Sequence, residues 1–243
     1  FNAFLENSKG LTTEQKQGLT EDQVMDLYDK YLAKYHVKGS DKLFDFIDET
    51  YNSDGSLSQE SMDQALAIIN FMRELVGIKT VTWDDDYNKA SQAGVDFLKD
   101  NKLDIDHEAA NGSGNALAAK GLMCSNLAQG SRSFYDLWDL LLMFYGDDDA
   151  SNRVALGHRA WMFNSSNTKM GLGYTTGNGL NYLAIYVMDM SNGYESDQYS
   201  DVNGSMPEEI LEEIRTSISC PWQVGVGYDT DQDSDITVTI TDS

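Results

Sequence analysis

The chain has 243 residues, of which 40 are Asp or Glu and 17 are Lys or Arg, so its formal net charge at pH 7 is 17 − 40 = −23. A chain this acidic repels phosphate backbones and anionic lipid surfaces, so we expect no binding to nucleic acid and an attraction for cations. The length suits one main domain. The most apolar stretch, 134–145, contains two Asp residues and is too short to cross a bilayer, so the chain is not expected to span a membrane.

The first 57 residues predict an N-terminal helical region. Thr20 and Gln23 have the spacing of a capping box. Apolar residues then recur on one helical face, at Val24, Leu27, Tyr31, Leu32 and Tyr35. A second short helix is predicted over 42–51, with Leu43, Phe44 and Ile47 inward. We divide the chain into this region, 1–57, and a main domain, 58–243.

Residues 52–57 link these two parts. They are similar to part of an EF-hand loop, but Thr50 and Ser61 stand where calcium requires carboxylates. An Asp-Gly turn that leads into a Ser-capped helix explains the same residues without a metal.

The middle of the chain predicts two helices. The first runs from Met62 to Gly77, a residue suited to ending a helix in the left-handed conformation. Val81 and Trp83 form a short extended link, and the second helix covers 84–101. His107 follows in a loop.

The second half predicts a mixture of helices and strands. Residues 109–130 are rich in Gly, Ala, Asn and Ser and predict a loop with at most a short helix. Residues 131–145 are apolar on nearly every side and predict the most buried helix. After an Asp-rich turn, 170–175 and 180–189 predict a hairpin. With a further helix over 208–218 and a strand over 235–242, the sum is an α+β fold in which helices pack on a modest antiparallel sheet.

Cys124 and Cys220 are the two cysteines, and two allow a single pairing. They are either buried thiols or a disulfide. A bridge would close a long loop and stabilise the fold by about 4 kcal/mol in the chain-entropy model.

Five short motifs occur in order along residues 62–189. They are Ile69-Asn-Phe-Met-Arg73 with Gly77, Ala90–Leu98 followed by His107, Cys124-Ser-Asn-Leu-Ala-Gln-Gly130, Asp147–Asn152 leading to Gly157-His-Arg-Ala-Trp161, and Met170-Gly-Leu-Gly-Tyr174. In order and spacing this series resembles the CAP superfamily, also called SCP-like extracellular domains, and especially its bacterial branch. The N-terminal region lies outside the resemblance.

The resemblance implies an α-β-α sandwich of CAP/SCP type, here with an added N-terminal helical region, in a secreted or cell-surface protein. It also implies a cleft in which two histidines and two acidic residues can hold a divalent cation. His107 matches the first histidine and His158 the second. Asp147 is the best match for one acidic position, with Asp148 a near alternative, and Ser125 stands at the other.

The predicted cleft therefore contains His107, Ser125, Asn126, Asp147 and His158. Two neutral imidazoles can bind zinc, and a carboxylate or water can complete the shell. The predicted metal ligands are His107, His158 and Asp147, with zinc or another divalent cation bound weakly because a hydroxyl replaces one carboxylate. A single histidine beside a buried helix is, however, more often a hydrogen-bonded packing residue than a ligand.

Three functions fit these residues. The first is a binding module whose cleft receives an extracellular peptide, glycan or lipid, without established catalysis. The second is an extracellular hydrolase, a protease or esterase, with Ser125 as nucleophile, His158 as base and Asp147 orienting it. The third is a purely structural role. No Gly-x-Ser-x-Gly motif occurs and Ser125 is not predicted to lie in a strand-turn-helix elbow, so the binding module is favoured. A hydrogen bond between Ser125 and His158 would favour the hydrolase.

Overall fold

The computed structural model of the protein describes residues 21–147, 157–164, 166–189 and 191. Several features predicted above lie outside these residues, namely Thr20, Asp148, Cys220, the helix over 208–218 and the strand over 235–242.

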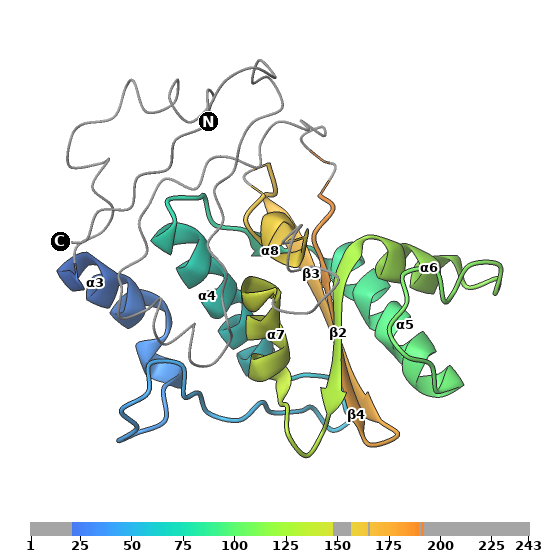
Figure 1. The fold of residues 1–243 in the computed structure, drawn as a ribbon, viewed down its shortest axis with the longest axis horizontal. Helices are drawn as coiled ribbons and strands as arrows, with labels where there is room; N and C mark the ends of the chain where they lie inside the picture. Colours follow the sequence, from blue (N-terminus) through green and yellow to red (C-terminus); the bar gives the residue numbers. More distant parts are fainter. Residues whose placement is uncertain (1–20, 148–156, 165, 190, 192–243) are drawn as a thin grey trace, which may run out of the picture.

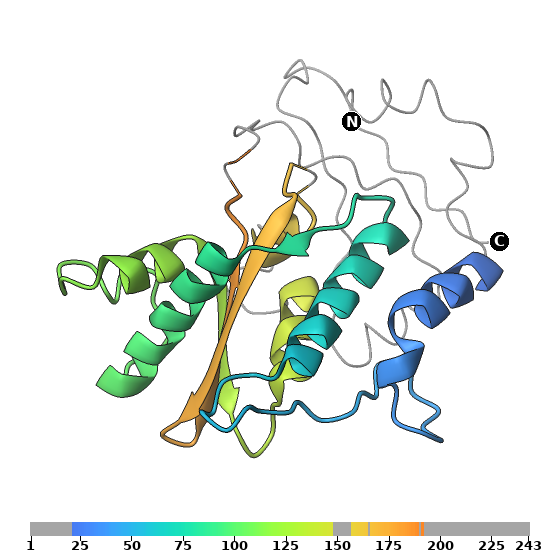
Figure 2. The same ribbon diagram turned by 180° about the vertical axis from the view of Figure 1, so that it is seen from behind.

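The fold has three layers, with a sheet between two groups of helices (Figure 1, Figure 2). One face of the sheet carries α5 (Asp85–Asn101) and α6 (Ala116–Met123). The other face carries α4 (Gln59–Leu75), α7 (Leu137–Gly146) and α8 (Gly157–Met162), and α3 (Glu21–Tyr31) lies outside α4. This arrangement confirms the predicted α+β fold.

The sheet contains four strands in the order β1-β3-β4-β2. Their bounds are β1 Thr82–Trp83, β2 Ser125–Ser131, β3 Lys169–Gly177 and β4 Leu180–Tyr186. Strands β3 and β4 form the predicted hairpin, and its turn residues Asn178 and Gly179 both have positive φ, as tight hairpin turns require. Strand β2 pairs antiparallel with β4, whereas β1 pairs parallel with β3, so the sheet is mixed and not purely antiparallel.

Helix α5 lies in direct backbone contact with its neighbours because glycines face it. A Cβ added at Gly171 would overlap the backbone of Tyr87, and one at Gly173 would overlap that of Ser91. Gly121 of α6 likewise leaves room for the carbonyl of Ala90. Only residues without a side chain allow this approach.

The larger core fills the space between the sheet and α4 and α7. The N-terminal region contributes to it through buried residues such as Leu32, Tyr35 and Phe46, which join the same cluster as Ile68 and Leu141. The N-terminal region and the main domain therefore share one core. A smaller cluster, which includes Val95, Leu122 and Tyr182, lies between the sheet and α5 and α6.

Arg73 ties α4 to the chain that follows α8. It is fully buried, and its guanidinium donates hydrogen bonds to the backbone oxygens of Lys79, Met162 and Asn164 at 2.8, 2.6 and 3.0 Å. Burial lowers the pKa of Arg73 to about 10. Arg73, the last residue of the motif Ile69-Asn-Phe-Met-Arg73, thus has a structural role inside the main domain.

The predicted helix over 42–51 is wrong. After a short 3-10 turn, Ala33–Tyr35, the chain runs back beside itself, and Ile47 N–H donates to Tyr35 O at 2.8 Å. Phe46 is buried, whereas Ile47 is 37 % exposed. A helix this short is marginal without tertiary support, so backbone pairing with an already ordered segment prevails.

Residues 109–137 also differ from the prediction. The short helix that the prediction allowed is α6, but the predicted loop also contains almost all of β2, whose Ser, Asn, Gln and Gly residues have low strand propensity. The buried helix begins at Leu137 and not at Ser131, because Asp136 and Asp139 form a capping box there. Among the described residues, no helix is long and apolar enough to cross a membrane.

Candidate functional site around His158

The candidate site is organised by a buried carboxylate at the end of α7. Asp147 has φ 51° as the residue after the helix, and its side chain is 0 % exposed. Its Oδ1 accepts a hydrogen bond from His158 Nδ1 at 2.8 Å, and its Oδ2 accepts one from the Arg159 backbone N–H at 2.8 Å. Because a carboxylate only accepts hydrogen bonds, the proton of the neutral imidazole is on Nδ1.

Arg159 holds this arrangement in place and was not predicted as a site residue. Its Nε donates to Tyr145 O at 2.6 Å and its Nη2 to Gly146 O at 2.8 Å. The guanidinium thus satisfies carbonyls at the C-terminal end of α7, where the helix dipole favours a cation. The signal in the sequence was its place directly after the histidine of the Gly-His-Arg motif.

Strand β2 joins the site through Asn126. The Asn126 side chain donates to His158 O at 2.9 Å. Ser125 faces the other side of the sheet, because successive side chains of a strand alternate, and its hydroxyl lies 3.4 Å from that of Ser91 in α5. Within the described residues Ser125 makes no hydrogen bond to His158. The structure therefore forms only the His158–Asp147 half of the arrangement that a hydrolase would need.

His107 approaches the beginning of β2 from the opposite layer. It is exposed, and its Nδ1 donates to Leu122 O at 2.7 Å, near the end of α6. The two histidines are thus anchored at Leu122 and Asn126, whose Cα atoms can lie at most about 14 Å apart. Hydrogen bonds join Asn126, Asp147 and His158 directly, and His107 is hydrogen-bonded to Leu122, shortly before β2.

Both histidines keep one ring nitrogen available. Within the part of the chain that the structure describes, neither Nε2 has a hydrogen-bond partner. The His158 side chain is 21 % exposed, and its ring lies 5.3 Å from that of Phe144. With Nδ1 protonated, each Nε2 is a hydrogen-bond acceptor.

The predicted metal ligands do not fit a three-ligand site. Among the described residues, no three His, Cys, Asp or Glu side chains are grouped so that they could hold a metal ion. Both oxygens of Asp147 are already bonded within the protein, and Ser125 faces the other layer. The ring nitrogens of His107 and His158 are the two donors that remain of the predicted set.

An aromatic cluster lies on the Ser125 side of β2. The rings of Tyr87 and Tyr186 stack at 4.1 Å, and Lys120 Nζ lies 5.8 and 5.7 Å from their centroids. Burial and then the Cys124 thiol raise the pKa of Tyr186. Cys124 forms no disulfide with a described residue.

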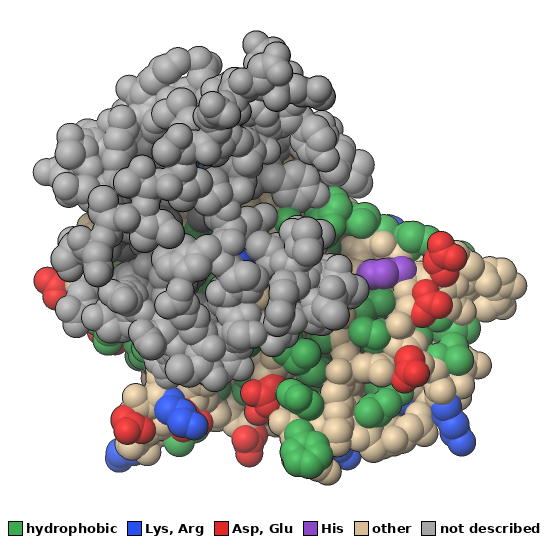
Figure 3. All heavy atoms as spheres, in the orientation of Figure 1, with side chains coloured by type: hydrophobic (Ala, Val, Ile, Leu, Met, Phe, Trp, Pro, Cys, Tyr) green, Lys and Arg blue, Asp and Glu red, His purple; other side chains and the backbone are tan. Residues whose placement is uncertain are grey.

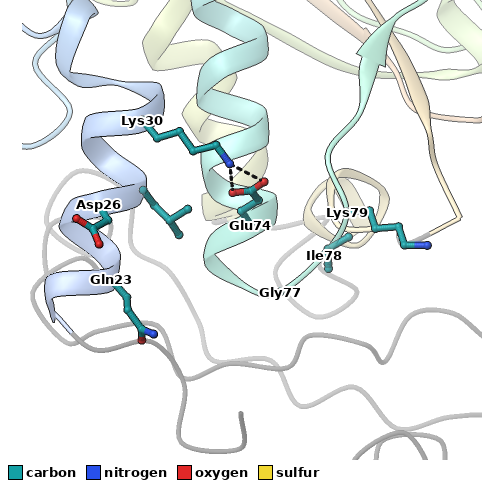
Figure 4. Close-up of a pocket in the computed structure, with 8 residues that line it drawn as sticks. Gln23, Asp26, Lys30, Glu74, Gly77, Ile78 and Lys79 are labelled. Atoms are coloured by element: carbon teal, nitrogen blue, oxygen red, sulfur yellow. Dashed lines mark hydrogen bonds and ion pairs between the residues drawn. The ribbon is translucent and has the colours of Figure 1, made fainter. Parts of the chain in front are cut away.

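A pocket of about 530 Å³ opens elsewhere, between α3 and the end of α4 (Figure 4). Leu27 and Ile78 contribute its apolar lining, and the ion pair between Lys30 and Glu74, at 2.8 Å, crosses its wall. None of the predicted site residues lines it.

The comparison with protein families agrees with the resemblance found in the sequence. The model of the cysteine-rich secretory protein (CAP) family matches residues 66–190, just over half of the chain. This range includes α5, the whole sheet and all five predicted cleft residues, and it excludes the N-terminal region. The comparison with curated proteins finds no match.

Proposed function

Because the chain belongs to the cysteine-rich secretory protein (CAP) family, we propose that it works outside the cell as a non-catalytic binding domain. Its ligand is held at the beginning of β2 by His158, with His107 at the other side of the site. That the chain is of the family's bacterial branch is part of the same proposal.

The observation that carries this proposal is the Asp147–His158 pair. A carboxylate with a fully buried side chain at a helix C-terminus is unfavourable by itself, since burial and the helix dipole both oppose the charge. Here two hydrogen bonds compensate it, and their combined effect is to fix the imidazole in one tautomer and one orientation. A fixed acceptor beside an aromatic ring suits a ligand that offers N–H or O–H groups, as peptides and glycans do.

Among the described residues, Ser125 is not placed as the nucleophile that the predicted hydrolase would require. The hydroxyl of Ser125 contacts Ser91 on the far face of β2, and the strand would have to turn over to bring it to His158. We expect no turnover of a generic peptide or ester. Turnover that disappears in Ser125→Ala would contradict this.

The binding proposal is tested by NMR titration of imidazole-labelled protein with short peptides and with oligosaccharides. We expect one of these two ligand classes to shift the His158 Nε2 resonance, and His158→Ala to lose at least about tenfold in affinity, as the loss of a central polar contact does. His36→Ala is the matched control, because His36 bonds Lys42 O in the N-terminal region, outside the site. Equal binding by wild type and His158→Ala, or no response to either class, would remove the proposal.

Cation binding is a separate prediction. The two imidazole nitrogens alone provide a weak site, and zinc affinity should fall on acidification, because a protonated imidazole is not a ligand. Calorimetry should show reduced uptake in His158→Ala and in His107→Ala, and unchanged uptake in His36→Ala. Identical uptake in all of these proteins would assign the zinc to surface carboxylates.

A further inference from the structure

The turn between β2 and α7 carries an exposed aromatic surface. Phe134 is 79 % exposed, the largest value among the exposed large hydrophobic residues that the structure describes, and Tyr135 beside it is 43 % exposed. The segment 47–51 adds Tyr51 at 42 % and Ile47 at 37 %. We call these four residues the aromatic patch.

The two segments of the patch lie together. Trp138, in the first turn of α7, donates its indole N–H to Ile47 O at 2.9 Å. The charge of Arg132 acts on Tyr51, and that of Glu49 acts on Asp136, which also brings the two segments together. Figure 3 shows apolar side chains beside acidic ones along the lower edge of the molecule, where Figure 1 places this turn.

The patch is held in shape by the fold beneath it. Tyr135 covers Gly130, where no side chain fits, and its carbonyl accepts a hydrogen bond from Asn181 at 2.8 Å. The Tyr51 hydroxyl donates to Glu49 at 2.8 Å, and Tyr174 shares the same carboxylate oxygen at 3.3 Å. An ordered group of apolar side chains that folding leaves exposed marks a contact surface.

The negative charge around the aromatic patch indicates the kind of partner that it would bind. The two segments 45–51 and 131–139 contain five acidic residues, Asp45, Asp48, Glu49, Asp136 and Asp139, and one basic residue, Arg132. Burial and the neighbouring carboxylates of Asp139 and Glu49 raise the pKa of Asp136 to about 6, so the acids repel one another. Lys and Arg side chains relieve this repulsion, and they also stack favourably on aromatic faces.

We propose that the aromatic patch docks a basic peptide segment that carries apolar side chains. The apolar groups cover Phe134 and Tyr135, and the cationic groups lie against the carboxylates around them. An anionic lipid surface is repelled by the same charges. The surface is separate from the His158 site and does not depend on the function proposed for it.

The test uses the whole protein and three synthetic probes, which are a peptide of alternating Lys and Leu, its Glu and Leu counterpart, and a neutral oligosaccharide. Fluorescence anisotropy and calorimetry should show binding of the first probe alone. Phe134→Ser should weaken it roughly tenfold, as the loss of a central aromatic anchor does. Asp48→Lys should weaken it about threefold at low salt, and less at high salt, because Asp48 is exposed.

Leu117→Ser is the matched control, because Leu117 is 47 % exposed on α6 and lies outside the patch. It should bind the Lys-Leu peptide as wild type does. Equal affinity of wild type and Phe134→Ser would overturn the proposal by showing that the anionic chain attracts the peptide unspecifically. Binding of the oligosaccharide in place of the peptide, weakened by Phe134→Ser, would overturn it by assigning the patch to a glycan.

Discussion

Asp189 is a buried carboxylate, 4 % exposed, and both of its oxygens accept hydrogen bonds. One oxygen receives the Tyr87 hydroxyl and the backbone and side chain of Ser191, and the other receives Thr168 and the Lys169 N–H. Burial by itself would raise the pKa of Asp189, but these hydrogen bonds outweigh it and hold the pKa at about 2. One carboxylate thus fastens the end of the hairpin to α5.

This pKa predicts acid sensitivity. The unfolded chain takes up a proton at Asp189 before the folded protein does, so the stabilisation is complete above about pH 4 and is lost as pH falls toward about 2. Asp189→Asn should lower the free energy of unfolding at pH 7 by about 2 kcal/mol, measured by urea denaturation, and should lose little more on acidification. Asp86→Asn is the control, because Asp86 is exposed on α5, the helix that Asp189 contacts through Tyr87. Parallel pH profiles for wild type and Asp189→Asn would contradict this assignment.

At the scale of the element, α5 packs closely on β3. The closest approach occurs where Gly173 faces the backbone of Ser91 and Gln92. The hydrogen bonds from Leu172 N–H to Asn88 and from Tyr174 N–H to Gln92, at 2.8 and 3.1 Å, follow from this approach.

Gly173→Ala should therefore destabilise the protein by at least about 3 kcal/mol, because backbone and not a flexible side chain blocks the new methyl group. Gly94→Ala provides the comparison. Its nearest neighbours are the Leu122 side chain at 3.1 Å and the Leu122 backbone nitrogen at 3.2 Å, which need to shift by only a few tenths of an ångström. Alanine also favours the helix, so we expect a change within about 1 kcal/mol. Thermal unfolding of both variants measures the difference, and equal stability would show that α5 can move away from the sheet.

The cap of α7 gives a prediction of the opposite sign. The pKa of Asp136 is raised to about 6 by burial and by Asp139 and Glu49, so the folded protein binds this proton more tightly than the unfolded chain does. Ionisation of Asp136 therefore lowers the free energy of unfolding increasingly as pH rises from about 4 to 6. Asp136→Asn keeps an N-cap acceptor without the charge and should stabilise the protein at pH 7 by about 1 to 2 kcal/mol, with little effect at pH 4. A loss of stability at pH 7 in urea denaturation would show that the charge is needed for the cap.

The elements that the sequence predicts well are those whose signal is local. Helices α4 and α5 have a clear apolar period, and the β3–β4 hairpin has its Asn-Gly turn. Strand β2 was missed because its residues favour a loop and only pairing with β4 makes it extended. That omission also explains Ser125. Its orientation follows from strand alternation, which a predicted loop does not define. Asn126, Asp147 and His158 are joined by hydrogen bonds that bridge distant parts of the sequence.

For the whole molecule, the dominant quantity is the net charge of −23. Self-repulsion among carboxylates opposes the compact state, and salt screens it over a distance that falls to about 8 Å at physiological ionic strength. Raising sodium chloride from about 10 to about 300 mM should therefore raise the thermal midpoint by roughly 2 to 4 °C, the shift that corresponds to about 1 kcal/mol in a chain of this size. A midpoint that falls with salt would show that attractive ion pairs outweigh the repulsion.

Asp147 combines two demands that rarely coincide at one position. Its backbone is left-handed, with φ 51°, a conformation that Gly, Asn and Asp accept most readily, and its side chain must offer two acceptors to His158 and Arg159. Glycine meets the first demand alone, glutamate meets the second at a strained backbone, and asparagine meets the first with one acceptor too few. In a library of every substitution at this position, Gly and Asn variants should retain the fold but lose the oriented histidine. A single substitution of Asp147 therefore disturbs the turn or the orientation of His158, because both depend on this one residue.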